Sequence, residues 1–162
     1  MASDEQIFTL HRYFVWASRQ RHYFFEGVPE TEFPEDSDEQ RNWIRTQFVN
    51  LCYWMASLYV VIEGWRALEL KDDEVDALLE SPHASALRRF RNGVFHFQKN
   101  YFDERFMGLF EDGGPVWASK LHKAFSRFFL DWFKARGINV TIGQEKDGVM
   151  TAHVSWPGGN EA

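Results

Sequence analysis

The chain has 162 residues, of which 44% are hydrophobic and 17% aromatic, and its formal net charge is −6. This length and apolar content predict one domain with a sizeable core, and they exclude disorder along the whole chain. The acidic balance excludes a surface that attracts nucleic acid everywhere, so any such contact must be local.

The tetrapeptide SDEQ occurs twice, at residues 3–6 and 37–40. A serine followed three positions later by glutamine is the capping-box pattern that begins a helix. We expect a first helix to about residue 26 and a second from about residue 38 to 70. A turn-rich acidic connector with Gly27, Pro29 and Pro34 joins them. Apolar side chains recur along the second helix every three to four residues: Trp43, Phe48, Leu51, Met55, Leu58, Ile62 and Trp65.

The first helix also carries cations among aromatic rings. Arg12, Arg19 and Arg21 lie close in sequence to Tyr13 and Trp16. Two interpretations stay open for this segment. It is either a basic-aromatic surface for nucleic acid or the polar face of an ordinary amphipathic helix.

Further helices are expected in the second half of the chain. The acidic first turn of KDDEVDALLE, residues 71–80, favours a short third helix. Ser81 and Pro82 favour the start of a fourth, from about residue 84 to 99. A short helical piece is expected at residues 103–110, and a last long helix from Pro115 to Gly137.

Two β-prone segments at the end of the chain flank Asp147 and Gly148, which predicts a hairpin over residues 137–156. The fold class expected is therefore all-α. It is a four- to five-helix up-and-down bundle over residues 3–136 with a short C-terminal β-hairpin appendage. Residues 1–162 are interpreted as a single domain.

The fourth helix contains RRFRNGVFHF, residues 88–97. At about 100° per residue, one apolar stripe is expected to face the core: Leu87, Phe90, Val94, Phe97 and Tyr101. The roughly opposite face carries Arg88, Arg89, Asn92, His96 and Lys99, with Arg91 at the border. Phe95 falls on this second face. An aromatic ring there predicts that another surface covers it, either a helix, the tail or a second protomer.

The stretch RNGVFH has the form Arg-Asn-x-x-x-His, with Arg91, Asn92 and His96. In this motif and in helix order, residues 3–136 resemble the HEPN superfamily (higher eukaryotes and prokaryotes nucleotide-binding). The resemblance implies a metal-independent endoribonuclease, as in many members from toxin–antitoxin and phage-defence systems. It also implies a homodimer formed through the helix with Arg91 and His96, RNA as the substrate, and an antitoxin or another protein as a further partner.

The same resemblance implies a role for each motif residue. His96 would transfer protons at the ribose 2′-hydroxyl or the leaving oxygen, as an imidazole can near neutral pH. Arg91 would stabilise the scissile phosphate through its forked donors, and Asn92 would orient His96 or the phosphate. Arg88, Arg89 and Lys99 would add a local basic patch for nucleic acid.

Other chemistry is weakly indicated. The six histidines show no spacing typical of a metal site, so neither a metal nor a cofactor is expected. Cys52 is the single cysteine and lies in an apolar run typical of a buried thiol. No signal-peptide pattern or membrane span is indicated, which favours a cytoplasmic protein without a membrane partner. Two alternatives stay open. One is a non-catalytic HEPN-like helical module that binds a protein, nucleotide or RNA, and the other is a structural bundle whose aromatic patches serve assembly.

Overall fold

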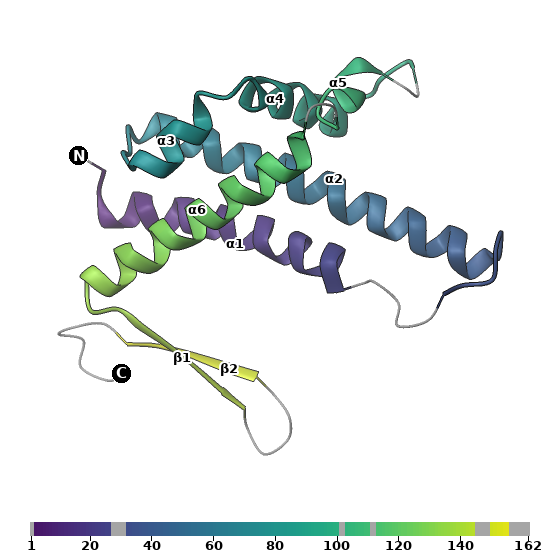
Figure 1. Ribbon diagram of the computed structural model, residues 1–162. Coiled ribbons are helices and arrows are strands. Elements are labelled where there is room, and N and C mark those ends of the chain that lie inside the picture. The colour runs from purple at the N-terminus through teal and green to yellow at the C-terminus, as the bar shows by residue number, and fades with distance from the viewer. Residues whose placement is uncertain (1, 27–31, 101–102, 111–112, 145–149, 156–162) are drawn as a thin grey trace. The chain divides into compact units, whose positions relative to one another are not determined.

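The computed structural model describes residues 2–26, 32–100, 103–110, 113–144 and 150–155. The fold class is all-α (Figure 1). The helices are α1 (Asp4–Glu26), α2 (Asp38–Ala67), α3 (Asp73–Leu79), α4 (Pro82–Phe95), α5 (Glu104–Met107) and α6 (Gly114–Ala135). Two short strands follow, β1 (Asn139–Gln144) and β2 (Met150–Ser155), and they pair antiparallel with Asn139 opposite Ser155. The expected turn residues Asp147 and Gly148 lie outside the described residues, as do Gly27 and Pro29 of the first connector.

The chain forms two compact units, Met1–Lys123 and Ala124–Ala162, with their boundary inside α6. The second unit contains the rest of α6 and the two strands. Within it, Arg127 and Asp131 form an ion pair of 3.6 Å, and the Arg136 guanidinium lies 3.8 Å from the centroid of the Trp132 ring. The functional residues expected from the sequence all belong to the first unit.

Serine caps begin the first two helices, as the SDEQ pattern predicts. At α1, the Gln6 N–H donates to Ser3 Oγ at 3.3 Å and the Ser3 N–H donates to Gln6 Oε1 at 2.8 Å. At α2, the Gln40 N–H donates to Ser37 Oγ at 3.1 Å, whereas the Gln40 amide oxygen accepts from the Asp36 N–H. These bonds satisfy backbone donors that a helix start leaves without partners, so both predicted starts are confirmed.

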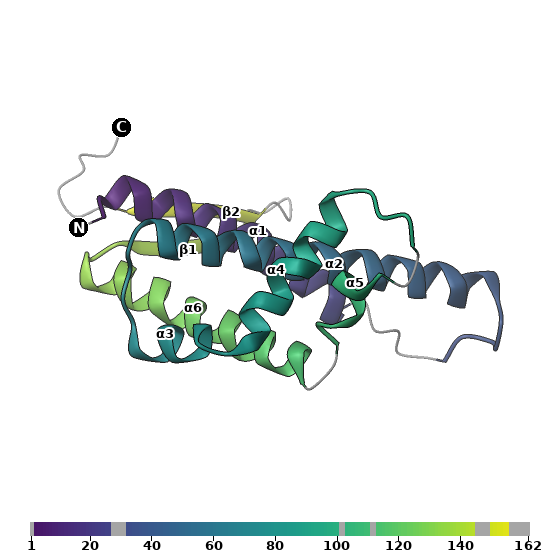
Figure 2. The ribbon, with the colours of Figure 1, turned by 90° about the horizontal axis from the view of Figure 1, so that it is seen from above.

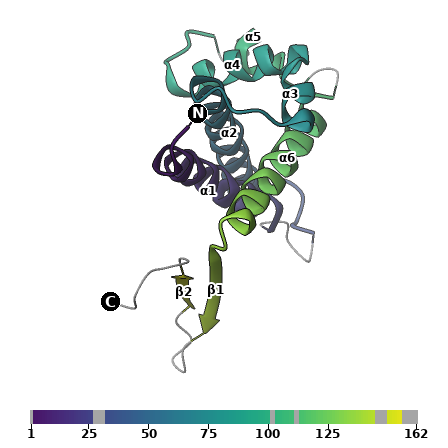
Figure 3. The same ribbon diagram turned by 90° about the vertical axis from the view of Figure 1, so that its left-hand side faces the viewer.

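In the first unit, α2 lies between α1 and α4 (Figure 3). Its middle and C-terminal turns are fully buried at Met55, Leu58, Ile62 and Trp65, as its apolar spacing predicts. Its first turns extend past the end of α1 (Figures 1 and 2). Phe48 belongs to the same apolar spacing, but its side chain is 50% exposed.

Helices α3 and α6 are tied to their neighbours by indole hydrogen bonds. Trp65 Nε1 donates to Asp76 Oδ1 at 3.0 Å, and Trp117 Nε1 donates to the Leu78 carbonyl at 2.9 Å. Helix α6 begins at Gly114, one residue before the expected Pro115. A Cβ on Gly114 would lie 1.8 Å from the Leu109 carbonyl oxygen, so only glycine fits there.

Candidate active site

Helix α4 ends at Phe95, four residues earlier than expected. Ser81 caps its start and Pro82 occupies the first turn, as predicted. His96 is the C-cap with extended backbone angles, φ −123° and ψ 133°, and its N–H still donates to the Asn92 carbonyl at 3.0 Å. The helical periodicity used for residues beyond Phe95 therefore does not apply.

Phe97 shows the error most clearly, because the apolar stripe assigned it to the core and it is 93% exposed. Gln98 stabilises the extended segment. Its amide donates to the His96 carbonyl at 2.6 Å, and its own oxygen accepts from Arg105 Nη1 at 2.6 Å. Leu87 and Phe90 are buried as expected, Val94 is only half-buried, and Tyr101 lies outside the described residues.

Arg91 and Asn92 are held against α2. Arg91 Nη1 donates to Asn92 Oδ1 at 3.0 Å, and its Nη2 donates to the carboxylate of Glu63. The guanidinium also lies over the buried Tyr59 ring, 5.3 Å from the centroid. The Arg91 side chain is 22% exposed, and its Nε is buried without a hydrogen-bond partner among the described residues. The predicted border position of Arg91 is confirmed, and the structure adds an acidic partner 28 residues away.

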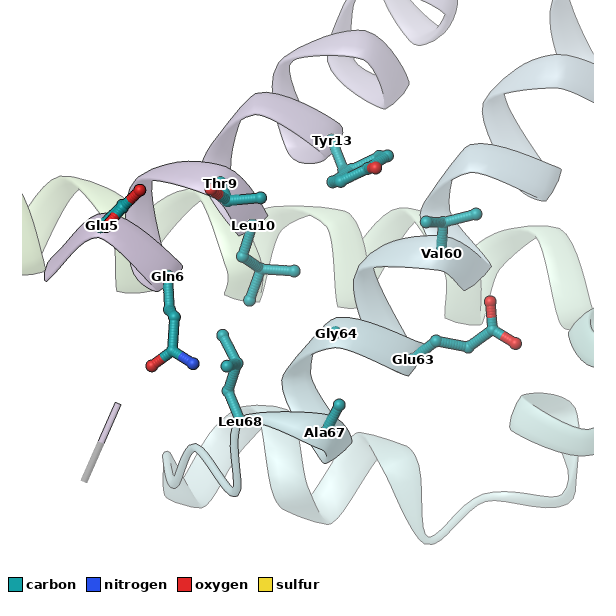
Figure 4. Close-up of a pocket in the computed structure, with 10 residues that line it drawn as sticks. All are labelled: Glu5, Gln6, Thr9, Leu10, Tyr13, Val60, Glu63, Gly64, Ala67 and Leu68. Atoms are coloured by element: carbon teal, nitrogen blue, oxygen red, sulfur yellow. The ribbon is translucent and has the colours of Figure 1, made fainter. Parts of the chain in front are cut away.

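Glu63 also lines a pocket between α1 and α2 (Figure 4). The pocket has a volume of about 620 Å³ and mostly apolar walls, with Leu10 and Leu68 among them. Tyr13 of α1 lines it as well. The Glu63 side chain is 45% exposed, so its ion pair with Arg91 is partly open to solvent.

His96 faces a different surface. Its exposed side chain lines an apolar groove of about 470 Å³ with Phe48 of α2, Phe95, Phe97 and α5 residues that include Phe106. Neither Arg91 nor Asn92 lines this groove. The structure thus brings Arg91 and Asn92 together within one chain. Among the described residues, their link to His96 is the backbone hydrogen bond from the His96 N–H to the Asn92 carbonyl at the end of α4.

Gly93 allows α5 to approach the motif. A Cβ on Gly93 would lie 3.2 Å from the Phe106 ring and 3.4 Å from Arg105 Cβ. Phe106 also packs edge-on against the buried Phe90 ring, with centroids 5.5 Å apart. The space beside Gly93 is therefore occupied by α5 of the same chain.

The three expected nucleic-acid contacts are all exposed, but they do not form one face. Arg88 and Arg89 lie on α4, whereas Lys99 lies beyond its end. Arg89 borders a surface depression with Arg105 and with Asp103 and Glu104, whose carboxylates offset the charge of the two arginines.

A second histidine, which the sequence did not single out, is buried inside the first unit. His122 of α6 is 6% exposed. Trp54 Nε1 donates to its Nδ1 at 3.2 Å, and its Nε2 lies 3.2 Å from Ser18 Oγ. Because an indole N–H only donates, Nδ1 carries no proton, so Nε2–H donates to Ser18. Burial and then the nearby Arg21 lower the His122 pKa to about 4.

Ser18 and His122 therefore do not form a nucleophile–base pair. The Nε2 that would accept the hydroxyl proton already carries one, and the lone pair on Nδ1 is used by Trp54. The burial of His122 could have been predicted from the sequence. His122 follows Leu121 and lies three residues before Phe125, and both belong to the apolar stripe of α6.

Cys52 is buried, and burial raises the pKa of its thiol to about 11, as expected for a structural cysteine. In the part of the chain that the structure describes, no three His, Cys, Asp or Glu side chains gather as metal ligands do. Over the same residues, no helix has both the length and the apolar character to cross a membrane.

In comparisons with known proteins, no family model, no curated protein and no solved structure matches the chain.

Proposed function

We propose that the protein is a HEPN-like, metal-independent endoribonuclease that works as a homodimer in the cytoplasm. The observation that carries this is the end of α4, where the exposed His96 follows a fixed Arg91–Asn92 pair and opens on an apolar groove. The finer fold that goes with the proposal is an up-and-down bundle with a β-hairpin appendage. An antitoxin or another protein would control its activity, as in toxin–antitoxin or phage-defence systems.

The reaction would use the RNA's own 2′-hydroxyl. One His96 imidazole accepts the hydroxyl proton while the 2′-oxygen attacks the adjacent phosphorus. The bond from phosphorus to O5′ breaks, and O5′ takes a proton from the imidazolium of the second His96 in the dimer. The products carry a 2′,3′-cyclic phosphate and a 5′-hydroxyl. Arg91 would stabilise the extra charge on the phosphate once a phosphate oxygen replaces the Glu63 carboxylate.

A second copy would complete the site. Phe95 and Tyr53 are each about half exposed, and their rings lie 6.1 Å apart beside the groove. Together with the exposed Phe48 and Phe97, they form an apolar surface next to His96. Packing two such surfaces around a two-fold axis would bury these rings and bring the two His96 side chains toward each other.

The direct test is cleavage of mixed RNAs by purified protein with EDTA present. We expect fragments with 2′,3′-cyclic phosphate ends from the wild type, and a rate about 10²- to 10⁴-fold lower for His96→Ala. Arg91→Ala tests the phosphate role in the same assay. If concentrated wild-type protein leaves every RNA intact, the cleavage proposal is wrong.

The dimer has its own test, because Cys52 is the single cysteine and is buried. A cysteine introduced as Phe97→Cys would be the accessible thiol. We expect rapid disulfide-linked dimers from this variant under mild oxidation. The matched control is Val116→Cys on α6, where the native side chain is 60% exposed and lies outside the groove. Equal cross-linking by both variants would contradict a dimer through the groove.

A second function is favoured by the ion pair between Arg91 and Glu63. A guanidinium already bound to a carboxylate and stacked on Tyr59 is suited to hold α4 on α2. In that case the chain would be a non-catalytic HEPN-like module that binds a protein, nucleotide or RNA partner. Recovery of a stable partner without RNA turnover would support this module, whereas turnover lost in His96→Ala would contradict it.

A further inference from the structure

Helix α1 carries a regular stripe of cations and aromatic rings on its solvent side. Arg12, Trp16, Arg19 and Tyr23 follow one another at spacings of four, three and four residues. At about 100° per residue they fall within an arc of about 60°. Trp16 is 52% exposed, Tyr23 is 44% exposed, and both arginines are exposed. We call these four residues the α1 stripe.

The structure changes the set of residues that the sequence suggested. Arg21 turns inward, with its guanidinium 5.5 Å from the Trp54 ring centroid and Nη2 3.5 Å from Ser119 Oγ. Tyr13 lines the pocket between α1 and α2. Tyr23 takes their place on the outer face, where its hydroxyl accepts from Arg19 Nε at 2.9 Å.

Each ring of the α1 stripe has an arginine beside it. The Arg12 guanidinium lies 5.8 Å from the Trp16 ring centroid, and the Arg19 guanidinium lies 4.7 Å from that of Tyr23. Among the described residues, no carboxylate forms an ion pair with Arg12 or Arg19. Both cations are therefore oriented by aromatic rings and stay available to an anion.

The charge along α1 is unlike that of the whole chain. No Asp or Glu occurs between Glu5 and Glu26, whereas three arginines do, in a protein of net charge −6. A local positive field on an acidic protein selects a ligand with negative charges spaced along its length. The two rings add a second requirement, because a partner must offer flat faces to stack on them.

We propose that the α1 stripe binds single-stranded nucleic acid, with bases stacked on Trp16 and Tyr23 and phosphates paired with Arg12 and Arg19. Trp16 and Tyr23 are seven residues apart, so the two rings are about 10.5 Å apart along the helix axis and can stack on two separate bases of one flexible strand. A duplex hides its base faces, so it would meet only the arginines. Stacking accepts any base, so the stripe binds without sequence preference.

This binding goes beyond the proposed cleavage and does not depend on it. A 12-nucleotide oligothymidylate lacks the 2′-hydroxyl, so the proposed chemistry cannot cut it. Its binding is measured by fluorescence anisotropy of a labelled probe at low salt. We expect a Kd of about 10⁻⁴ to 10⁻⁶ M for the wild type at physiological salt, and tighter binding at low salt.

The variants separate stacking from charge. Trp16→Ala should weaken binding about tenfold. Arg12→Gln with Arg19→Gln should make the slope of log K against log salt shallower by about 1.4, because two phosphate contacts are lost. The matched control is Arg66→Gln with Lys71→Gln, which removes the same charge from two exposed positions, one in the last turn of α2 and one beyond its end. It should leave affinity and slope nearly unchanged.

Several results would overturn the proposal. The proposal is wrong if the wild-type protein does not bind the probe. It is also wrong if the control pair weakens binding as much as the stripe pair, because binding would then depend on net charge alone. Equal affinity for a 12-base-pair duplex would show that the rings do not stack on bases. A stripe variant that changes the oligomeric state in sedimentation and leaves probe binding intact would identify the face as a protein interface.

Discussion

The protein has one histidine at the open end of α4 and another inside its first compact unit. His96 has an exposed ring that lines a groove, and Arg91 lies five residues before it. His122 is buried with Arg21 nearby, and both of its ring nitrogens are engaged, by Trp54 and Ser18. Of these two histidines, His96 is the one with a ring that a substrate can reach.

This difference separates a histidine that holds a fold from one that can transfer protons. A proton carrier needs a nitrogen that is open to the substrate and able to change its protonation state. The two hydrogen bonds of His122 leave neither ring nitrogen open to a substrate, and its low pKa keeps the ring neutral near pH 7. The predictions below test this contrast through stability, from the largest expected change to the smallest.

Removing the His122 ring should lower the free energy of unfolding more than any other change considered below. His122→Ala leaves a cavity and deprives the Trp54 N–H of its acceptor, so we expect a loss of about 3–5 kcal/mol in the free energy of unfolding. Urea denaturation measures it. His122→Asn keeps an acceptor for Trp54 and should lose less. An alanine variant as stable as the wild type would show that the buried hydrogen bonds are not formed.

The pH dependence of stability should report the same residue. The pKa of His122 is about 4 in the folded chain and has its ordinary value of 6.5 in the unfolded chain, so unfolding takes up a proton between these values. Its contribution to stability is complete above pH 6.5 and is lost as the pH falls toward about 4, by about 3 kcal/mol. Relative to the wild type, His122→Asn should flatten the curve in this window. Parallel curves would contradict a buried neutral imidazole.

Arg91→Ala should have an intermediate effect. It removes a side chain that is 22% exposed, that stacks on Tyr59 and that bonds to Glu63 and Asn92. We expect a loss of about 1–2 kcal/mol by urea denaturation. Arg88→Ala on the exposed face of α4 is the matched control and should change little. A loss as large as that of His122→Ala would mean that Arg91 is chiefly structural.

Substitutions at the end of α4 should change the free energy of unfolding least. His96→Asn changes an exposed side chain, and we expect it to alter the unfolding free energy by less than about 0.5 kcal/mol. Phe97→Ser should change it as little at a protein concentration where the chain is monomeric, since the ring is exposed in one copy. At higher concentration the serine variant should be destabilised relative to the wild type, because the proposed dimer buries this ring. An effect that does not depend on protein concentration would contradict a dimer through Phe97.

Local sequence signals predicted much of the fold. Ser3, Ser37 and Ser81 mark helix starts through hydrogen bonds that span two or three residues, and the apolar spacing of α2 located its buried core. The predictions that were wrong depend on contacts between residues far apart in the sequence. The apolar pattern of α4 continues through Phe97, but bonds among His96, Gln98 and Arg105 hold that segment extended.

The candidate site shows the same limit. The motif residues Arg91, Asn92 and His96 were identified through their resemblance to the HEPN motif, and helical spacing predicted the border position of Arg91. The pairing of Arg91 with Glu63 joins residues 28 apart, and no periodicity predicts it. The groove at His96 forms only because α4 ends early and α5 packs on Gly93.

The contrast between the two histidines is tested most directly by RNA cleavage with matched variants. His96→Asn and His122→Asn make the same change of imidazole to amide, and both are assayed with EDTA at a temperature where circular dichroism shows them folded. We expect His96→Asn to lose about 10²- to 10⁴-fold in rate and His122→Asn to cleave at close to the wild-type rate. Undiminished cleavage by His96→Asn, or equal loss in both variants, would contradict the assignment of His96 as the catalytic histidine.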